Sequence, residues 1–313
     1  MRKQLITIFG STFRLSSDGS KMTHGKDNNI IDTLKSFLSS RGLDEQFPLD
    51  NWEVQFIDES TGAHATHDLI LKVAQIYEQT DDLIAIIGTD SMEEISFGLS
   101  LLDLKLENKN LVLTGAMRPA DHLAFDGLSN LLDTILYCET QNKKLEHRYY
   151  SNQCEPNKVA VLIQNTIFDG GRLFKSNSSS MQGFEQTKER YDLPKFNPLL
   201  LKNAFPNIPI ITTALGLKPD FINFETLDGL VIAGMGTSSL NQEWIDYLRP
   251  KSRDIPIALV SRCPFGNNYD DLSYINSIQK YEDLGFHLNR FRNLNPLQAR
   301  LLLGYEYLDR QNR

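Results

Sequence analysis

Short, uninterrupted apolar runs place the strongest constraint on how this chain folds. They are rich in β-branched residues, each ends at a glycine or a polar residue, and in the first part of the chain they cover residues 5–9, 83–87, 111–113 and 159–163. Such runs are typical of strands that are buried on both faces, as in a parallel sheet. Between them lie segments with the apolar spacing of helices, near residues 31–38, 69–76, 92–102 and 125–135. This alternation predicts a doubly wound α/β domain with a mostly parallel sheet.

The alternation stops near residue 190 and resumes further along. Residues 191–208 are rich in proline and asparagine and show no period, so they predict a linker. Strand-like runs then return at residues 208–212, 229–233 and 257–260, with helical patterns at 242–248 and 294–308. We therefore expect a catalytic α/β domain over residues 1–190 and a smaller α/β domain over residues 209–313.

Composition excludes several classes of protein. The formal net charge is -8 over 313 residues, and the charges are mixed along the chain, so we expect no nucleic-acid partner. Cys138, Cys154 and Cys263 are far apart and form neither a disulfide framework nor a CxxC pair. The first apolar run is too short for a secretory signal, and no segment is long enough to span a membrane. These features predict a soluble protein of a reducing cytoplasm, with no membrane partner.

Polar residues that can carry chemistry gather where the predicted strands end. Thr12 follows the first strand, Thr89 and Asp90 follow the second, Ala116 follows the third, and Lys175 lies beyond the fourth. Ligands of open α/β sheets bind at the carboxyl ends of the strands. A hydroxyl nucleophile needs a neighbouring base, and a desolvated lysine can serve as one. Two hydroxyls, a carboxylate and an amine in one crevice could therefore activate a nucleophile.

Taken singly, these residues also fit structural roles. Asp90 and Glu93 have the spacing of a helix capping box, which is the favoured interpretation of that pair in isolation. Arg118 and Asp126 fit a loop ion pair, and Lys175 fits a solvated loop residue among serines. Only their joint presence favours catalysis.

Signals for a cofactor are weak. His64 and His67 have helical spacing, but no third ligand follows, so we favour two solvated histidines over a metal site. Residues 10–19 lack the glycine pattern of a nucleotide-binding loop. We expect no metal and no organic cofactor.

Six segments together resemble the bacterial-type L-asparaginase family, in particular its cytoplasmic members. They read IGTDSMEE at residues 87–94, LTGAMRP at 113–119, DGLSNL at 126–131, FKSNSS at 174–179, SRCPFG at 261–266 and LNPLQAR at 294–300. The similarity spans almost the whole chain, and the pairing of TDSMEE with LTGAMRP is highly specific to that family. The resemblance implies an α/β amidohydrolase, an enzyme that hydrolyses linear amides.

The resemblance also implies a mechanism. L-Asparagine would be converted to L-aspartate and ammonia, with Thr12 as the nucleophile and a β-aspartyl-threonyl enzyme as the intermediate. Thr89, Asp90 and Lys175 match a second triad, in which the lysine, held by the carboxylate, activates a threonine or its attached water. Backbone N–H groups near the two threonines would form the oxyanion hole.

Substrate contacts and assembly follow from the same resemblance. The implied substrate-binding residues are Asp58, Glu59, Ser60, Thr89, Asp90 and Ala116. Ser60, with the backbone of residues 58 and 59, would receive the α-carboxylate, and Asp90 would hold the α-ammonium. The carbonyl of Ala116 would accept a hydrogen bond from the leaving amide nitrogen. The family closes each site with a neighbour's small domain, so we expect a homodimer or a homotetramer.

Several positions depart from the family pattern. Residues 9–12 read FGST where the family has TGGT, Ile87 replaces a histidine, and the first tyrosine is Tyr77, although the family carries one soon after the nucleophile. His24 lies close to that place, as a solvated loop residue or as a substitute base. The departures leave two alternatives: hydrolysis of glutamine or a larger asparaginyl amide, or a catalytically silent protein that binds asparagine or aspartate. Retention of both threonines, Asp90 and Lys175 argues against silence.

Overall fold

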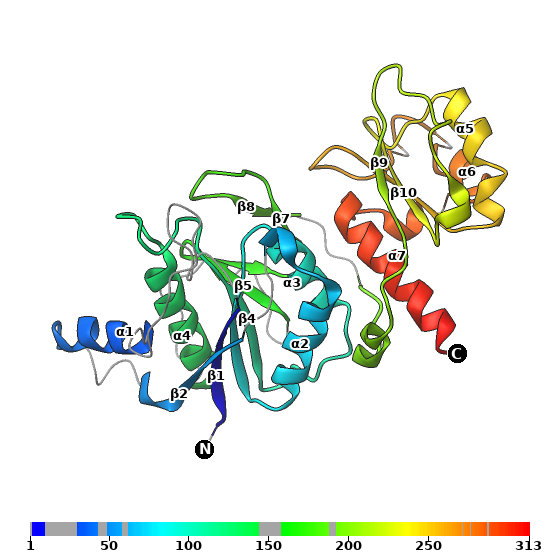
Figure 1. Cartoon of the computed structure of the whole chain (residues 1–313). Helices are drawn as coiled ribbons and strands as arrows, with labels where there is room; N and C mark the ends of the chain where they lie inside the picture. Colours follow the sequence, from blue (N-terminus) through cyan, green and yellow to red (C-terminus); the bar gives the residue numbers. More distant parts are fainter. Residues whose placement is uncertain are drawn as a thin grey trace. The chain divides into compact units, whose positions relative to one another are not determined.

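The computed structural model of the chain consists of two compact units, Met1–Gln186 and Thr187–Arg313 (Figure 1). The structure describes residues 2–9, 30–42, 49–57, 62–143, 158–187, 192–270, 272–275, 277–286 and 288–313. Each unit is α/β. The catalytic role predicted for the first domain stays a prediction.

A six-stranded sheet forms the centre of the first unit, in the order β2-β1-β3-β4-β5-β6. The strands are β1 (Gln4–Ile8), β2 (Trp52–Phe56), β3 (Asp82–Ile86), β4 (Asn110–Thr114), β5 (Ala160–Ile163) and β6 (Thr166–Asp169). All neighbours are parallel except β5 and β6. Four of these strands coincide with the apolar runs, because strands covered on both faces must be apolar throughout. The predicted mostly parallel α/β fold is confirmed.

Helices cover both faces of this sheet. Figure 1 shows α1 (Ile30–Ser39) and α4 (Gly127–Lys143) on one side, with α2 (His67–Glu78) and α3 (Met92–Ser100) on the other. The buried core on the α1 and α4 side combines side chains from strands and helices: Ile6, Ile8, Ile84, Ile86, Leu34, Leu38, Leu131 and Ile135. Burial of each such side chain contributes about 1.5–3 kcal/mol, so packing of these faces dominates the stability of the unit.

Some elements of the first unit were not predicted. The edge strand β2 has one buried residue, Trp52, and one half-buried residue, Val54; its other three positions are exposed, so it lacks a continuous apolar run. β7 (Leu173–Lys175) and β8 (Phe184–Gln186) have three residues each and form a separate two-stranded antiparallel sheet. Strands this short carry too few residues for a periodic signal.

The second unit has a three-stranded parallel sheet in the order β11-β10-β9. Its elements are β9 (Ile210–Thr212), β10 (Leu230–Gly234), α5 (Gln242–Leu248), β11 (Ile257–Ser261), α6 (Ser277–Glu282) and α7 (Pro296–Gln311). α7 begins with a capping box between Asn295 and Gln298. The segment predicted as a linker includes a 3₁₀-helix at Pro198–Lys202 and the buried Phe196, whose ring lies 5.8 Å from that of Tyr305 in α7. Part of the predicted linker is therefore packed within the second unit.

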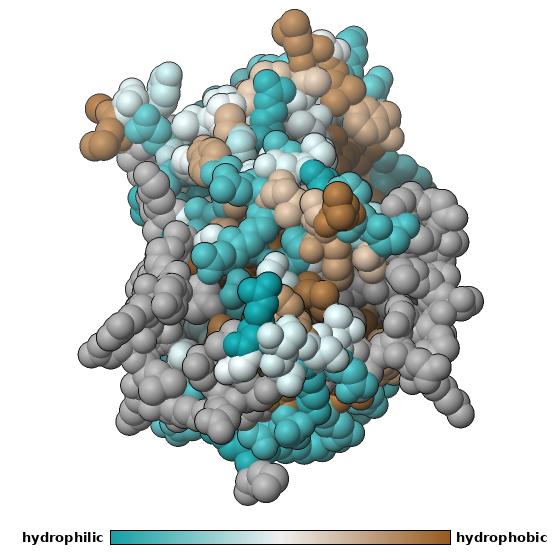
Figure 2. Space-filling view, turned by 90° about the vertical axis from the view of Figure 1, so that its left-hand side faces the viewer, coloured by the Kyte–Doolittle hydropathy of each residue, from teal (hydrophilic) through white to brown (hydrophobic). Residues whose placement is uncertain are grey.

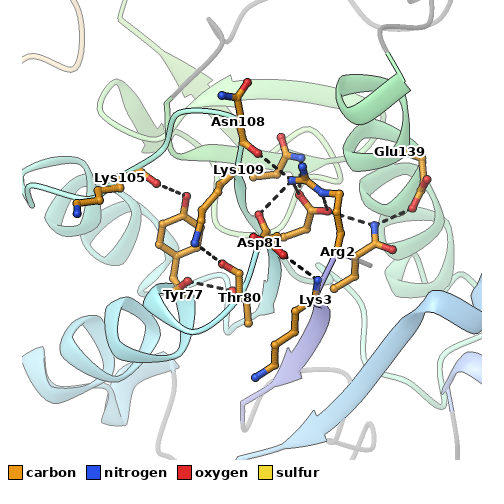
Figure 3. Close-up of polar contacts among 12 residues, drawn as sticks. Arg2, Lys3, Tyr77, Thr80, Asp81, Lys105, Asn108, Lys109 and Glu139 are labelled. Atoms are coloured by element: carbon orange, nitrogen blue, oxygen red, sulfur yellow. Dashed lines mark hydrogen bonds and ion pairs between the residues drawn. The ribbon is translucent and has the colours of Figure 1, made fainter.

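Polar contacts connect residues at the amino-terminal ends of the strands in the first unit (Figure 3). Asp82, at the start of β3, is completely buried and accepts two hydrogen bonds from the Arg2 guanidinium, at 2.7 and 3.0 Å. The Asn110 side chain donates to the same carboxylate at 2.7 Å. Gln4 Nε2 donates both to Asp82, at 3.1 Å, and to Glu139 of α4, at 2.8 Å. The network ties β1, β3, β4 and α4 together at the end of the sheet opposite the predicted site.

We expect Asp82→Ala to lower the free energy of unfolding by about 3–5 kcal/mol, because it leaves a cation and two amides without their shared acceptor. Urea denaturation followed by circular dichroism would measure the change. Asp81→Ala is the matched control: Asp81 accepts the exposed Lys3 N–H at 2.9 Å, so its loss should cost about 1 kcal/mol or less. Equal losses in the two variants would contradict a special role for the buried carboxylate.

Candidate active site

Thr89 and Asp90 lie in the turn between β3 and α3, at the carboxyl end of the sheet. The Ile87 N–H donates to the Thr114 carbonyl at 2.9 Å, which extends the pairing of β3 and β4 up to this turn. Thr89 is buried, whereas the Asp90 side chain remains 68% exposed. A buried hydroxyl therefore lies directly beside a carboxylate that solvent or a ligand can reach.

Lys175, at the end of β7, brings its amine to this turn. Its Nζ donates to Thr89 Oγ1 at 3.2 Å and to Asp90 Oδ1 at 2.6 Å. Its side chain is only 17% exposed, and the ring of Phe184 on β8 lies 6.0 Å from the amine. The structure thus brings three of the four predicted catalytic residues together across 86 positions of sequence.

This contact has a clear chemical use. A neutral lysine amine 3.2 Å from a hydroxyl can take its proton, and the neighbouring carboxylate stabilises the ammonium that results. The short Asp90 contact is a charge-assisted hydrogen bond, which also fixes the direction in which Nζ points. The Thr89 hydroxyl therefore has a general base, Lys175, within hydrogen-bond distance.

Two structural interpretations made from the sequence are wrong: the capping box of Asp90 and Glu93, and the solvated loop position of Lys175. The N-cap of α3 is Ser91, which makes no capping hydrogen bond through its side chain among the described residues. The Asp90 carboxylate is bound to Lys175 instead, and Glu93 Oε2 accepts the backbone N–H of Lys175 at 2.9 Å. Lys175 itself lies in a strand and is mostly buried, rather than solvated in a loop. A capping box and this arrangement share the same acidic spacing, which is why the local pattern misled.

Asp126 and Asn130 brace the turn that carries Ala116. Asp126 accepts the backbone N–H groups of Met117, at 3.1 Å, and Arg118, at 3.0 Å, rather than forming the predicted loop ion pair. Asn130 Nδ2 donates to the carbonyl of Gly115 and to Asp126, both at 2.9 Å. Ala116 is itself completely buried. The DGLSN segment was recognised from sequence as a helix start, but its role in holding this turn was missed.

Gly115 allows the turns after β3 and β4 to approach closely. A Cβ atom at this position would lie 2.6 Å from the Ile87 carbonyl oxygen and 3.4 Å from Thr89 Cγ2. The first distance is well inside van der Waals contact with rigid backbone, so any other residue would displace the turn that carries Thr89. The glycine of LTGAMRP is thus required by the site's geometry.

Thr12, Asp58, Glu59, Ser60 and His24 lie outside the described residues. Phe9 and Gly62, described residues close in sequence to Thr12 and to residues 58–60, lie near the end of β3 and the turn that follows it. β1 pairs with β3 up to Ile8 and Ile86, and the Phe9 N–H then donates to the Ile86 carbonyl at 3.0 Å. A Cβ on Gly62 would lie 4.0 Å from Asp90 Oδ2.

The described part of the chain contains neither a cluster of metal ligands nor a membrane-spanning helix. Its His, Cys, Asp and Glu side chains form no group of three or more with the arrangement of a metal site. Within the same residues, no helix has both the length and the apolar character needed to cross a bilayer.

Residues 31–193 match the family model described as "Asparaginase, N-terminal". The chain therefore belongs to the asparaginase family of amidohydrolases, and the resemblance found in its sequence is confirmed.

Individual relatives agree with this assignment. L-asparaginase 2 of Escherichia coli (strain K12) is 24% identical over 266 residues, covering 75% of this chain and 68% of the relative. A protein named "Probable L-asparaginase periplasmic", from Haemophilus influenzae, is 26% identical over 251 residues, covering 72% of this chain and 66% of its own length. The crystal structure of a probable cytoplasmic L-asparaginase from Campylobacter jejuni matches with a TM-score of 0.71 at 22% identity, over 97% of this chain and 95% of that one. That likeness establishes a shared fold.

Proposed function

We propose that this protein hydrolyses the side-chain amide of L-asparagine, giving L-aspartate and ammonia. The observation that carries the proposal is the contact of Lys175 Nζ with Thr89 and Asp90 at the carboxyl end of a parallel sheet. Membership of the asparaginase family supports it, since the relatives are named for this reaction. The likeness to a structure described as a probable cytoplasmic L-asparaginase, together with the separated cysteines, leads us to propose a cytoplasmic location.

In the proposed reaction, Thr12 Oγ attacks the amide carbonyl and forms a tetrahedral oxyanion, which backbone N–H groups near Thr12 and Thr89 stabilise. The proton of the Thr12 hydroxyl passes to the amide nitrogen, the C–N bond breaks, and ammonia leaves. Water then attacks the β-aspartyl ester and releases aspartate and the free threonine. The Thr89–Asp90–Lys175 group supplies the base that activates a threonine or this water.

Substrate recognition uses both charged groups on the α-carbon of the amino acid. The exposed Asp90 carboxylate would hold the α-ammonium, and Ser60 with the backbone of Asp58 and Glu59 would receive the α-carboxylate. The Ala116 carbonyl would orient the amide nitrogen, with its turn held by the brace of Asp126 and Asn130. The proposal involves no metal and no organic cofactor.

Ammonia release from the purified protein would test this function against a panel of asparagine, glutamine and short amides such as succinamic acid. We expect the highest kcat/KM with asparagine. Faster hydrolysis of glutamine would favour the alternative amide substrate. Asparagine binding measured by calorimetry, with no ammonia from any amide, would instead identify a silent binding protein and contradict the proposal.

An exposed apolar loop in the second unit supports the proposed self-association. Leu272 is 94% and Ile275 80% exposed, with Tyr274 and Phe265 also exposed nearby in sequence. The Asp270 carboxylate accepts the backbone N–H groups of Leu272 and Ser273, and the Ser273 hydrogen bond lowers the pKa of Asp270. Figure 2 shows single apolar side chains that project from a largely hydrophilic surface. Exposed apolar side chains that gather in one region are typical of an interface.

We expect the Leu272→Glu, Ile275→Glu double variant to weaken a homodimer or homotetramer by about a hundredfold or more, since each carboxylate would lose its water on association. Sedimentation velocity across a dilution series would measure the shift, and activity should fall with the oligomer. Leu215→Glu is the control, because Leu215 is 98% exposed in another loop of the same unit. A fully active monomeric parent protein would contradict the assembly proposal.

A further inference from the structure

The backbone of Lys175, and not only its amine, is held by a side chain. Its N–H donates to Glu93 Oε2 at 2.9 Å, across 82 positions of sequence. In the described part of the chain, β7 pairs with β8 in a sheet of its own, apart from the six-stranded sheet. The ladder of the main sheet therefore does not set the position of Lys175 relative to the end of β3. The Glu93 contact connects β7 directly to the first turn of α3, which follows β3.

One short segment holds Lys175 at both ends. Thr89 and Asp90 bind the amine, and Glu93, in the first turn of α3, binds the backbone N–H. A lysine side chain has four rotatable methylene groups, so its amine can miss a target by several ångströms unless the backbone is also fixed. Because both contacts come from residues 89–93, any small shift of α3 carries hydroxyl, carboxylate and lysine together.

Burial makes the Glu93 contact specific. Glu93 is only 7% exposed, although an isolated glutamate is almost always at the surface. Its carboxylate lies at the amino-terminal end of α3, where the helix dipole favours a negative charge. Hydrogen bonds to a charged acceptor are shorter and stronger than neutral ones.

We propose that Glu93 is a positioning residue for the reaction, which keeps Lys175 Nζ within proton-transfer distance of Thr89. The inference rests on the proposed function, because it assigns Glu93 a role through the base of that mechanism. Glu93 acts through the Lys175 backbone, whose N–H it accepts.

The test compares Glu93→Ala with Glu93→Gln. Glutamine keeps an acceptor oxygen at the same reach, so Glu93→Gln should retain most of the kcat for asparagine. Glu93→Ala should lower kcat by about 10²-fold with little change in KM, the expected cost of a misplaced catalytic group. Glu93→Asp, one methylene shorter, should show an intermediate loss and serves in place of Glu93→Ala if that variant does not fold. Glu185→Ala, on the exposed face of β8, is the control and should match the parent protein.

A double-mutant cycle separates positioning from general stability. In a Lys175→Met background, Glu93→Ala should cause no further loss of kcat, while it should lower Tm as much as it does in the parent protein. An equal loss of kcat in both backgrounds, or no loss in either, would overturn the inference.

Hydrogen exchange of the Lys175 amide gives a readout without catalysis. Exchange should be faster in Glu93→Ala and unchanged in Glu93→Gln. Normal hydrolysis by Lys175→Met would refute both Lys175 as the general base of the proposed function and the catalytic role of Glu93. The exchange result would then report only the structural contact between Glu93 and the Lys175 amide. Unchanged exchange with an inactive Lys175→Met would refute the Glu93 inference alone.

Discussion

Lys175→Met should lower kcat for asparagine by about 10²–10⁴-fold, the usual contribution of a positioned general base. Methionine fills a similar volume but has no amine to take a proton from the threonine 3.2 Å away. Thr89→Val should cost a similar factor, because it removes the partner of the same proton transfer. The double variant should lose little more than either single variant, since members of one catalytic unit are not additive. Steady-state ammonia release would measure all three.

Folding should be nearly unaffected by this change, which makes the kinetic result interpretable. The partner carboxylate of Lys175 is 68% exposed, and ion pairs with an exposed partner contribute about 1 kcal/mol or less. Lys158→Met, on an exposed residue next to β5, is the matched control and should keep full activity. Fully additive losses in the Lys175→Met, Thr89→Val protein would show that the lysine works elsewhere.

The parts of the fold that could be predicted from sequence are those with a strong one-dimensional signal. β1, β3, β4 and β5 are covered on both faces, so their apolar runs are continuous and their positions were predicted to within about two residues. β2 was not predicted, because an edge strand with exposed positions needs no continuous apolar run. β7, which carries Lys175, was not predicted because it has only three residues.

The site shows a sharper limit of local patterns. Asp90 and Glu93 have the spacing of a capping box, but both bind Lys175, which lies more than 80 residues further along the chain. A local pattern contains no information about such a partner. Asn130 carries a further sequence signal, since it is a polar residue among leucines in a helical pattern. It is buried in α4, and a buried amide needs hydrogen-bond partners. Its contacts to Gly115 and Asp126 are those partners.

Thr12 is the remaining catalytic residue of the proposal, and its role rests on the family resemblance. Thr12→Ala should lower kcat by on the order of 10⁴-fold or more, because the acyl-enzyme can no longer form. Thr12→Ser keeps a hydroxyl in place and should retain far more activity. Thermal unfolding of the variants, compared with the parent protein, would show that the loss is chemical rather than structural.

Trapping the intermediate distinguishes the two threonines. Acid quenching during turnover, followed by peptide mass spectrometry, should show a β-aspartyl adduct on the peptide that contains Thr12. No adduct should form in Thr12→Ala, whereas Thr12→Ser should form one at the new serine. The peptide that contains Thr89 should remain unmodified in every variant, because its hydroxyl is paired with Lys175 and serves proton transfer. An adduct on Thr89, or near-normal hydrolysis by Thr12→Ala, would reverse the assignment and make the buried threonine beside Lys175 the nucleophile.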